Sequence, residues 1–360
     1  MAKFPEGNAV VYCDGAFNTT YGKTAHGLVR FTKRYRVLSL IDRRHAGSDA
    51  GEVLDGYPRG IPVVASLDAA LAAANDKGVS ATHFVVGVAT DGGVMDEETL
   101  AAVKQAISKG LNVDSGLHDL MGENTELVRL AARKGVVLRD VRRTPPRREM
   151  HAFSGRIDMV GALRIALLGT DSAVGKRTTA WILVRGLQEA GLSAEMIGTG
   201  QTAWMQGVEY GIIMDSLLND FVAGEIENQV VRAWEEKHPD VIVVEGQGSL
   251  MNPAYPGGFE ILAAARPHAI VLQHSPSRVD YDGFPGYPLH PIETQIKAIE
   301  FLSGRPVVAV AVNHEGLGND EIAFACTKLS EETGLPACDP IVDGPDVLVK
   351  VVRRLLDQHT

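Results

Sequence analysis

A strand, a glycine-rich loop and a helix follow one another without a break after Leu163, and this feature constrains the fold most. Leu163 to Leu168 is a mostly apolar run, Gly169 to Thr179 reads GTDSAVGKRTT, and a helical pattern follows. Glycines let backbone N–H groups converge on an anion, the helix adds its positive end, and Lys176 adds a mobile charge. The sequence therefore predicts an α/β protein in which residues 169–179 form a phosphate-binding loop, called the phosphate loop below.

Apolar runs alternate with helical segments along the whole chain, as expected for parallel strands that crossover helices bury on both faces. The predicted strands are Ala9 to Cys13, Arg36 to Ile41, Pro62 to Ala65, His83 to Val88, Asn112 to Asp114, Val136 to Leu138, Leu163 to Leu168, Ala194 to Ile197, Val241 to Val244, Ala269 to Leu272 and Val307 to Val312. Among the helices we predict Asp68 to Asn75, Glu97 to Lys109, Asn124 to Lys134, Lys176 to Ala190, Ser216 to Lys237 and Pro291 to Ser303.

A basic stretch with two prolines, Arg139 to Arg148, interrupts this alternation, because Pro145 and Pro146 cannot continue helix or sheet hydrogen bonding. We therefore predict an N-terminal Rossmann-like parallel-sheet domain over residues 1–140 and a linker over 141–155. A C-terminal, doubly wound domain of the P-loop NTPase type follows over 156–360.

The composition limits the possible partners. The net charge of −10 argues against non-specific binding of nucleic acid, which requires a cationic surface, and favours a small-molecule substrate. No run approaches the roughly 18 apolar residues that span a bilayer. Three widely spaced cysteines, Cys13, Cys326 and Cys338, favour reduced thiols rather than disulfides or a zinc site. We expect a cytoplasmic protein without a membrane partner, and a homo-oligomer.

The phosphate loop departs from the usual pattern in two ways. Five residues separate Gly169 from Gly175, and Arg177 takes the place of the hydroxyl residue that binds magnesium. GTDSAVGK is similar to the variant loop of dethiobiotin synthetase, and in that alignment Thr178 becomes the hydroxyl on the metal side. The cofactor-binding residues predicted in the loop are Gly169, Thr170, Asp171, Gly175, Lys176, Arg177, Thr178 and Thr179.

A second glycine–lysine pattern occurs after the first strand, at Gly15 and Gly22-Lys23-Thr24. Six residues separate the two glycines, which is too many for an ordinary phosphate loop, so a structural turn is favoured over a second anion site.

A carboxylate follows the strand Val241 to Val244, in the segment Glu245-Gly246-Gln247-Gly248-Ser249. Ligands of open α/β sheets bind at the carboxyl ends of the strands, which places Glu245 beside the phosphate loop. The segment is similar to EGAGG of dethiobiotin synthetase, in which the glutamate faces magnesium. Magnesium would bridge phosphate oxygens, and its predicted ligands are Thr178, Asp215 and Glu245.

Further polar residues follow other strands of this domain. Gln201 and Thr202 lie in a loop rich in glycine and amides and are predicted to bind substrate, whereas Glu225 and Glu227 are expected to be solvated helix charges. Arg278 is a candidate clamp for a substrate carboxylate.

His274, at a strand end, could be a general base, a ligand or a hydrogen-bonded core residue. We predict Lys176, Glu245 and His274 as the catalytic residues. Asn313 follows the strand Val307 to Val312, where many related P-loop proteins place an asparagine on a purine edge. It could instead form only a turn.

Together, GTDSAVGKRTT, GTGQTAWMQG, DSLLNDFVAGEIE and VVEGQGSLMNP resemble a P-loop family catalogued as a domain of unknown function with a Rossmann-like companion domain. The resemblance covers nearly the whole chain. Members with an assigned activity are D-glutamate N-acetyltransferases, so the resemblance implies acetyl transfer from acetyl-CoA to the amine of D-glutamate. Coenzyme A carries a 3′-phospho-ADP moiety, whose pyrophosphate the loop could hold.

Two other functions remain open at the level of the sequence. Lys176 and Glu245 also suit ATP with Mg²⁺, as in a ligase that activates a carboxylate as an acyl phosphate for attack by an amine. A nucleotide-sensing switch without turnover is the third possibility. The cofactor is therefore predicted to be acetyl-CoA or ATP, the latter with Mg²⁺.

Overall fold

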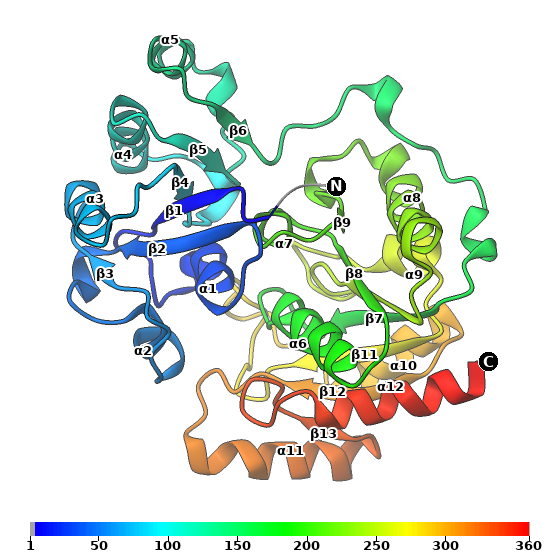
Figure 1. Ribbon diagram of the computed structural model, residues 1–360. Coiled ribbons are helices and arrows are strands. Elements are labelled where there is room, and N and C mark those ends of the chain that lie inside the picture. The colour runs from blue at the N-terminus through cyan, green and yellow to red at the C-terminus, as the bar shows by residue number, and fades with distance from the viewer. Residues whose placement is uncertain (1–3, 360) are drawn as a thin grey trace. The chain divides into compact units, whose positions relative to one another are not determined.

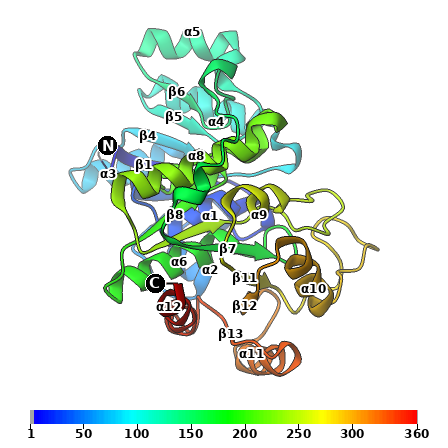
Figure 2. The ribbon, with the colours of Figure 1, turned by 90° about the vertical axis from the view of Figure 1, so that its right-hand side faces the viewer.

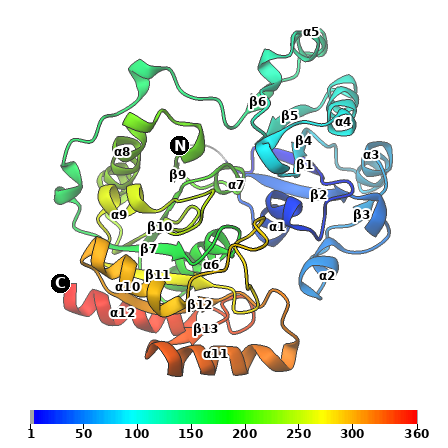
Figure 3. The ribbon, with the colours of Figure 1, turned by 180° about the vertical axis from the view of Figure 1, so that it is seen from behind.

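The first part of the chain forms a six-stranded parallel sheet with the strand order β3-β2-β1-β4-β5-β6 (Figure 1). The computed structural model describes residues 4–359. The elements of this part are β1 (Gly7–Tyr12), α1 (Lys23–Arg30), β2 (Tyr35–Ile41), α2 (Ala50–Asp55), β3 (Val63–Val64), α3 (Leu67–Asp76), β4 (His83–Val86), α4 (Glu97–Ser108), β5 (Asn112–Ser115), α5 (Thr125–Lys134) and β6 (Leu138–Asp140). Helices α3, α4 and α5 follow one another on one side of the sheet, and α1 lies beside α2 (Figure 3).

The second part forms a seven-stranded parallel sheet with the order β13-β12-β11-β7-β10-β8-β9. Its elements are β7 (Leu163–Gly169), α6 (Lys176–Glu189), β8 (Ala194–Gly198), β9 (Tyr210–Gly211), α8 (Asn219–Lys237), β10 (Val241–Glu245), α9 (Phe259–Ala265), β11 (Ala269–His274), α10 (Ile292–Ser303), β12 (Val307–Val312), α11 (Asn319–Thr333), β13 (Ala337–Cys338) and α12 (Asp346–His359). Helices α6 and α12 lie on one side of this sheet, and α9 and α10 lie on the other (Figure 2).

Burial on both faces explains why the central strands of the second sheet are apolar throughout. All seven residues of β7 and all five of β10 are buried. Helices on both faces remove every side-chain position from water, so alternation between polar and apolar residues disappears. The carboxyl ends of parallel strands lie at the same edge of the sheet. The phosphate loop, which follows β7, therefore lies at the same edge as the segments that follow β10, β11 and β12.

The two compact units do not coincide with a single cut in the sequence. One unit comprises the chain up to Thr144 together with Gln201–Glu209, and the other comprises Pro145–Gly200 and Tyr210–Thr360. Helix α7 (Gln201–Met205) therefore follows β8 in sequence but packs in the first unit.

Hydrogen bonds to α1 and to its C-terminal end hold residues 201–209 in the first unit. The side chain of Gln206 donates to the carbonyl oxygens of Gly27 and Phe31, at 2.8 and 2.9 Å, and Thr202 Oγ1 lies 3.0 Å from Thr24 Oγ1. These side-chain contacts place the segment firmly on the first unit.

A buried cation extends this attachment. Arg34 donates from Nε to the carbonyl oxygen of Trp204, and its guanidinium carbon lies 3.6 Å from the centre of the Trp204 ring. Arg34 is itself only 5% exposed and forms an ion pair with Glu6. The attachment of α7 is thus a desolvated, charged contact rather than a loose surface one.

The stretch that connects the two units is fastened to α8 by two carboxylates. Glu225 accepts hydrogen bonds from the backbone N–H of His151 and lies 3.0 Å from its ring Nδ1. Glu227 accepts from the N–H and hydroxyl of Ser154 and from the N–H of Ile157. Glu225 and Glu227 are buried, so the expectation that they are solvated helix charges was wrong. Protein donors, mostly backbone N–H groups, take the place of water around these two carboxylates. No sequence pattern predicts such donors.

The predicted fold class is confirmed. All eleven predicted strands are present, although β6 begins two residues later than expected, and the structure adds the short strands β9 and β13. All three cysteines are free and buried. Among residues 4–359, no helix combines the length and apolar character needed to cross a membrane. The connection from β1 to α1 contains Gly15 and Gly22. Thr24, in the first turn of α1, is buried in its contact with Thr202.

Candidate functional site

The phosphate loop begins where β7 ends and closes where α6 begins. Ala173 and Gly175 have positive φ values of 52° and 104°, so two residues of this short loop adopt the left-handed backbone conformation. The Lys176 ammonium group donates to the carbonyl oxygens of Asp171 and Gly248, both at 2.7 Å. Lys176 thus joins the loop to the segment after β10. An arriving phosphate would meet this ammonium together with the N-terminus of α6.

Glu245, at the end of β10, is almost completely buried beside the phosphate loop. Its Oε2 accepts the backbone N–H of Thr199 at 2.8 Å, and its carbonyl oxygen accepts the Thr199 hydroxyl. Burial raises the pKa of Glu245 above its usual value, although Arg177, the Thr199 N–H and Lys176 act in the opposite direction. The carboxylate therefore fixes the start of the segment after β8.

Gly246 lies at a close approach of two chain segments. A Cβ atom at this position would lie 2.0 Å from the carbonyl oxygen of Leu167. Only glycine allows the segment after β10 to lie against β7 at this point, and this contact keeps Gly248 within reach of Lys176.

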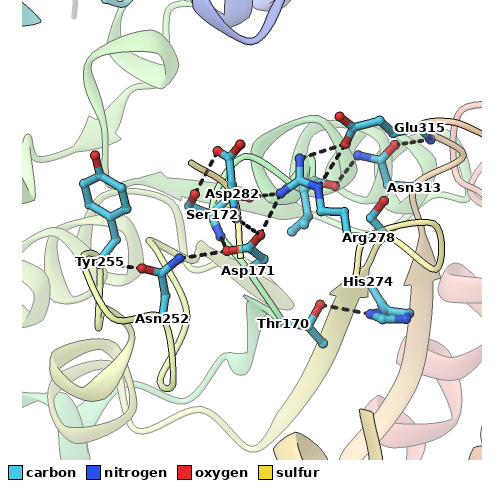
Figure 4. A network of polar contacts seen from close by, with 12 residues as sticks. Thr170, Asp171, Ser172, Asn252, Tyr255, His274, Arg278, Asp282, Asn313 and Glu315 are labelled. Atoms are coloured by element: carbon cyan, nitrogen blue, oxygen red, sulfur yellow. Dashed lines mark hydrogen bonds and ion pairs between the residues drawn. The ribbon is translucent and has the colours of Figure 1, made fainter. Parts of the chain in front are cut away.

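Asp171 is the centre of the polar network around the loop (Figure 4). Its Oδ1 accepts from the amide of Asn252 and the N–H of Ser172, and its Oδ2 accepts from Arg278 Nη1 and the N–H of Asp282. Asp171 has no exposed surface. Four donors saturate its carboxylate, so Asp171 holds the loop in shape, and its predicted contact with a cofactor stays a prediction.

Arg278 is committed to protein acceptors on two sides. Nη1 donates to Asp171 and to the carbonyl oxygen of Ser172, while Nε and Nη2 donate to Glu315 Oε2 at 3.1 and 2.7 Å (Figure 4). The Arg278 side chain is 10% exposed, but that of Glu315 is 46% exposed. A substrate carboxylate would meet this guanidinium on the side that Glu315 occupies.

His274, which ends β11, faces the loop with a low basicity. Its Nδ1 lies 2.9 Å from the hydroxyl of Thr170, which is fully buried (Figure 4). Burial lowers the pKa of His274 to about 4. At neutral pH the imidazole is uncharged and binds protons weakly, so it suits a hydrogen-bonded support of the loop better than a general base.

Two amide side chains brace the end of the loop. Gln273 accepts from the hydroxyl of Thr179 at 2.5 Å. Asn313 donates to the carbonyl oxygen of Val174 at 2.9 Å and accepts from the N–H of Glu315 (Figure 4). Both functions of the Asn313 amide are engaged by backbone, which favours the turn that we had left open beside contact with a purine.

The remaining predicted residues are distributed over different surroundings. Gln201 and Thr202 belong to the first compact unit and are at most 8% exposed, and their role in substrate binding stays a prediction. Asp215 lies on a short 3-10 helix, Met214–Ser216, and is exposed. Arg177 and Thr178 are half-buried in the first turn of α6.

The predicted magnesium ligands do not form a carboxylate cluster. Within residues 4–359 no group of three or more His, Cys, Asp or Glu side chains is arranged to hold a metal ion. Thr178 and Glu245 are close to the phosphate loop in sequence or in space, but Asp215 contributes no second buried carboxylate. Magnesium binding by Thr178, Asp215 and Glu245 therefore stays a prediction.

Several residues that shape the site were not predicted: Thr199, Asn252, Gln273, Asp282 and Glu315. Their side chains or backbone donors hold Glu245, Asp171, Thr179 or Arg278 in place. Gln273 lies near the carboxyl end of β11 and the other four lie in segments that follow a strand, and this position is the one signal in the sequence that could have identified them.

Comparisons with known proteins extend these observations. Two family descriptions match the chain: "Domain of unknown function (DUF1611_N) Rossmann-like domain" over residues 43–144 and "Domain of unknown function (DUF1611_C) P-loop domain" over residues 151–349. A protein of Pseudoalteromonas sp. named D-glutamate N-acetyltransferase is 33% identical over 278 residues, which cover 75% of this chain and 81% of that protein.

A second protein of the same name, from Tritonibacter scottomollicae, is 31% identical over 279 residues, or 76% of this chain and 81% of that protein. The crystal structure of a DUF1611 family protein from Anabaena variabilis is 28% identical and has a TM-score of 0.87, covering 97% of this chain and 100% of that one. With a Rossmann-like sheet, a phosphate loop and these matches over most of its length, the chain belongs to the DUF1611 family.

Proposed function

We propose that this protein is a D-glutamate N-acetyltransferase that transfers the acetyl group of acetyl-CoA to the amine of D-glutamate. The observation that carries the proposal is the similarity to two proteins of that name over about three quarters of the chain. The phosphate loop supports it, because a strand end, a helix N-terminus and a buried lysine form a site for the pyrophosphate of coenzyme A.

In this proposal some residues of the site bind the cofactor and others hold the loop in shape. Lys176 and the N–H groups at the start of α6 bind pyrophosphate, and Thr178 and Thr179 lie in the same turn. Asp171, Arg278 and Asn252 keep the loop in shape. In this proposal Lys176 contributes binding energy, and the reaction at the thioester takes place further along the cofactor.

Arg278 offers a route for recognising a carboxylate of the substrate. Glu315 Oε2 accepts from both Nε and Nη2 at the outer edge, and Glu315 is half exposed, so a carboxylate of D-glutamate could replace it and accept from the same two donors. The inner edge would remain on Asp171, and the guanidinium would stay oriented during the exchange.

The second candidate is an ATP- and Mg²⁺-dependent ligase. A buried lysine and a buried glutamate beside a phosphate loop favour it, because this pair suits stabilisation of a transferred phosphoryl group. The two candidates differ in their products: the first releases a thiol, and the second releases ADP.

Calorimetry with acetyl-CoA and with ATP plus Mg²⁺, followed by a thiol-release assay, distinguishes them. We expect binding of acetyl-CoA and thiol release that depends on D-glutamate. Lys176→Ala should weaken acetyl-CoA binding at least about tenfold, which corresponds to ~1.4 kcal/mol. Lys350→Ala, which changes an exposed lysine of α12, is the matched control and should bind as the wild type does. ADP formation without thiol release would contradict the proposal.

A further inference from the structure

A cluster of cationic side chains lies at the amino ends of three neighbouring strands in the second sheet. Arg164 is the second residue of β7, His268 directly precedes β11, and Arg305 lies two residues before β12. These strands are parallel and adjacent, so their amino ends lie at one edge of the sheet. At ~3.3 Å per residue, Arg164 lies roughly 16 Å from Gly169 at the other end of β7. The cluster is therefore separate from the phosphate loop.

His268 faces a hydrogen-bond donor at each of its ring nitrogens. The backbone N–H of Arg164 donates to Nδ1 at 3.0 Å, and Arg164 Nη2 lies 3.4 Å from Nε2. A neutral imidazole has one nitrogen that accepts and one that donates. Since Nδ1 makes the shorter contact with a fixed backbone donor, Nε2 carries the proton. The Nε2–H group of His268 and the Nη2–H group of Arg164 then face each other without an acceptor between them.

Arg164 carries a buried charge that the protein does not pair. It is 7% exposed, and within residues 4–359 it forms no ion pair. Its Nε and Nη1 atoms donate to the carbonyl oxygens of Arg266 and Val160, at 3.2 and 2.7 Å. Burial lowers the pKa of Arg164 to about 10, although Asp158 acts in the opposite direction. Asp158 itself pairs with Arg266 at 2.7 Å. A buried charge is normally paired with an opposite one, and an anion would fill this role.

The surroundings of His268 add further positive charge and are open to water. Arg305 is exposed, and among the described residues its guanidinium forms neither a hydrogen bond nor an ion pair. The ring of His359, which is also exposed, has its centre 4.3 Å from that of His268. Burial, together with the charges of Arg164, His359 and Arg305, lowers the pKa of His268 below its usual value. His268 is therefore a neutral donor in a cationic environment.

We propose that Arg164, His268 and Arg305 form a second anion site, which binds a phosphate-type dianion. One oxygen of the anion accepts from both His268 Nε2 and Arg164 Nη2, so the two facing donors gain the acceptor that they lack. Arg305 adds a charge-assisted hydrogen bond from the solvent side. Because Nδ1 continues to accept the backbone N–H of Arg164, binding does not require a protonated imidazole.

Calorimetry with sulfate tests the site, because sulfate is a dianion throughout the neutral range. The phosphate loop could bind the same ion, so the titrations use the Lys176→Ala protein at constant ionic strength. We expect sulfate to bind this protein. Adding His268→Asn, which keeps an acceptor near Nδ1 and removes the Nε2–H donor, should weaken binding at least about tenfold. Arg305→Gln, at an exposed position that does not support the fold, should have a similar effect.

Arg36→Gln is the matched control, because it removes the same charge from an exposed arginine of β2. It should leave the affinity for sulfate unchanged. Equal affinities in the Lys176→Ala protein and in both variants of the site would overturn the proposal, as would the absence of sulfate binding to the Lys176→Ala protein.

The tautomer of His268 provides a second measurement. NMR of the imidazole nitrogens should show the proton on Nε2 and a shift of this signal when sulfate is added, whereas a proton on Nδ1 would contradict the proposal. Titration with inorganic phosphate and with glycerol 3-phosphate then identifies the source of the anion. Tighter binding of either one supports the site, and the tighter ligand shows whether it takes the free ion or a phosphate monoester.

Discussion

Arg278 Nη1 lies 2.9 Å from Asp171 Oδ2, and this ion pair is removed from water on both sides: the Asp171 side chain has no exposed surface and that of Arg278 is 10% exposed. We predict that Arg278→Met destabilises the protein by about 3 kcal/mol, because it leaves a buried carboxylate without its cation. Urea unfolding measures this change. Arg266→Met is the control, because its pair with Asp158 is half exposed and contributes about 0.5 kcal/mol. Equal effects of the two variants would contradict the structural role of Arg278.

Glu227 should make stability depend on pH in the acidic range. Burial alone would raise the pKa of Glu227, but hydrogen bonds from Ser154, Ile157 and Gly155 outweigh it and hold the pKa below the usual value of 4.5. A carboxyl group with a lowered pKa in the folded state stabilises it above the pKa of the unfolded chain, and the effect disappears as the pH falls through the folded value. Glu227→Gln should therefore cost about 2 kcal/mol near neutral pH.

The measurement is the free energy of unfolding of the wild type and Glu227→Gln as a function of pH. The two curves should converge below the usual pKa of 4.5. Glu235 lies on the same helix as Glu227 and forms an exposed ion pair with Arg156. Glu235→Gln should therefore change the free energy of unfolding far less than Glu227→Gln does. A gap that stays constant down to the lowest pH would show that the hydrogen bonds to Glu227 do not depend on its charge.

His274 should titrate far below other histidines. Its pKa of about 4 in the folded protein is lower than the usual 6.5, so the unfolded chain binds more protons between these values. The stability contributed by neutral His274 is complete above pH 6.5 and declines as the pH falls towards about 4. Histidine NMR titration should give a midpoint near 4 for the signal that His274→Gln removes. A midpoint near 6.5 would contradict the buried contact with Thr170.

Gln206 should contribute to the stability of the first compact unit although it lies between β8 and β9 in the sequence. Gln206→Leu removes both donors to Gly27 and Phe31 at a position that is 2% exposed. We expect a loss of about 2 kcal/mol, because a buried hydrogen-bonding group is left without its partner. Gln105, on α4, donates an exposed hydrogen bond to Asp68. Gln105→Leu should therefore lower the melting temperature much less than Gln206→Leu does. Equal melting temperatures for the two variants would argue against the attachment.

The elements that the sequence predicted well depend on short-range patterns. The apolar run of β7 and the change to helical periodicity at Lys176 locate the phosphate loop, because burial on both faces and the conformational freedom of Gly175 act within a few residues. Helix ends follow the same rule: Asn124 caps α5 with its side chain, and Gly135 ends it in the left-handed conformation.

Long-range contacts account for what the sequence did not reveal. Gln201 and Thr202 look like loop residues of the phosphate-binding domain, but their environment comes from α1, far away in the chain. Asp171 lies in the phosphate loop, yet Asn252 and Arg278 donate to its carboxylate from positions 81 and 107 residues later. No local sequence pattern predicts these contacts, because the residues that form them are far apart in the chain.

Residues 201–209 also determine how this protein can be divided. The chain passes from one compact unit to the other at three places, after Thr144, after Gly200 and after Glu209. A fragment that starts after the linker would carry α7 without the surface that buries it, and a fragment that stops there would expose the surface that α7 covers. We therefore expect neither half to fold well when it is expressed alone. For the same reason, relatives should have kept the two halves together rather than exchanged one of them.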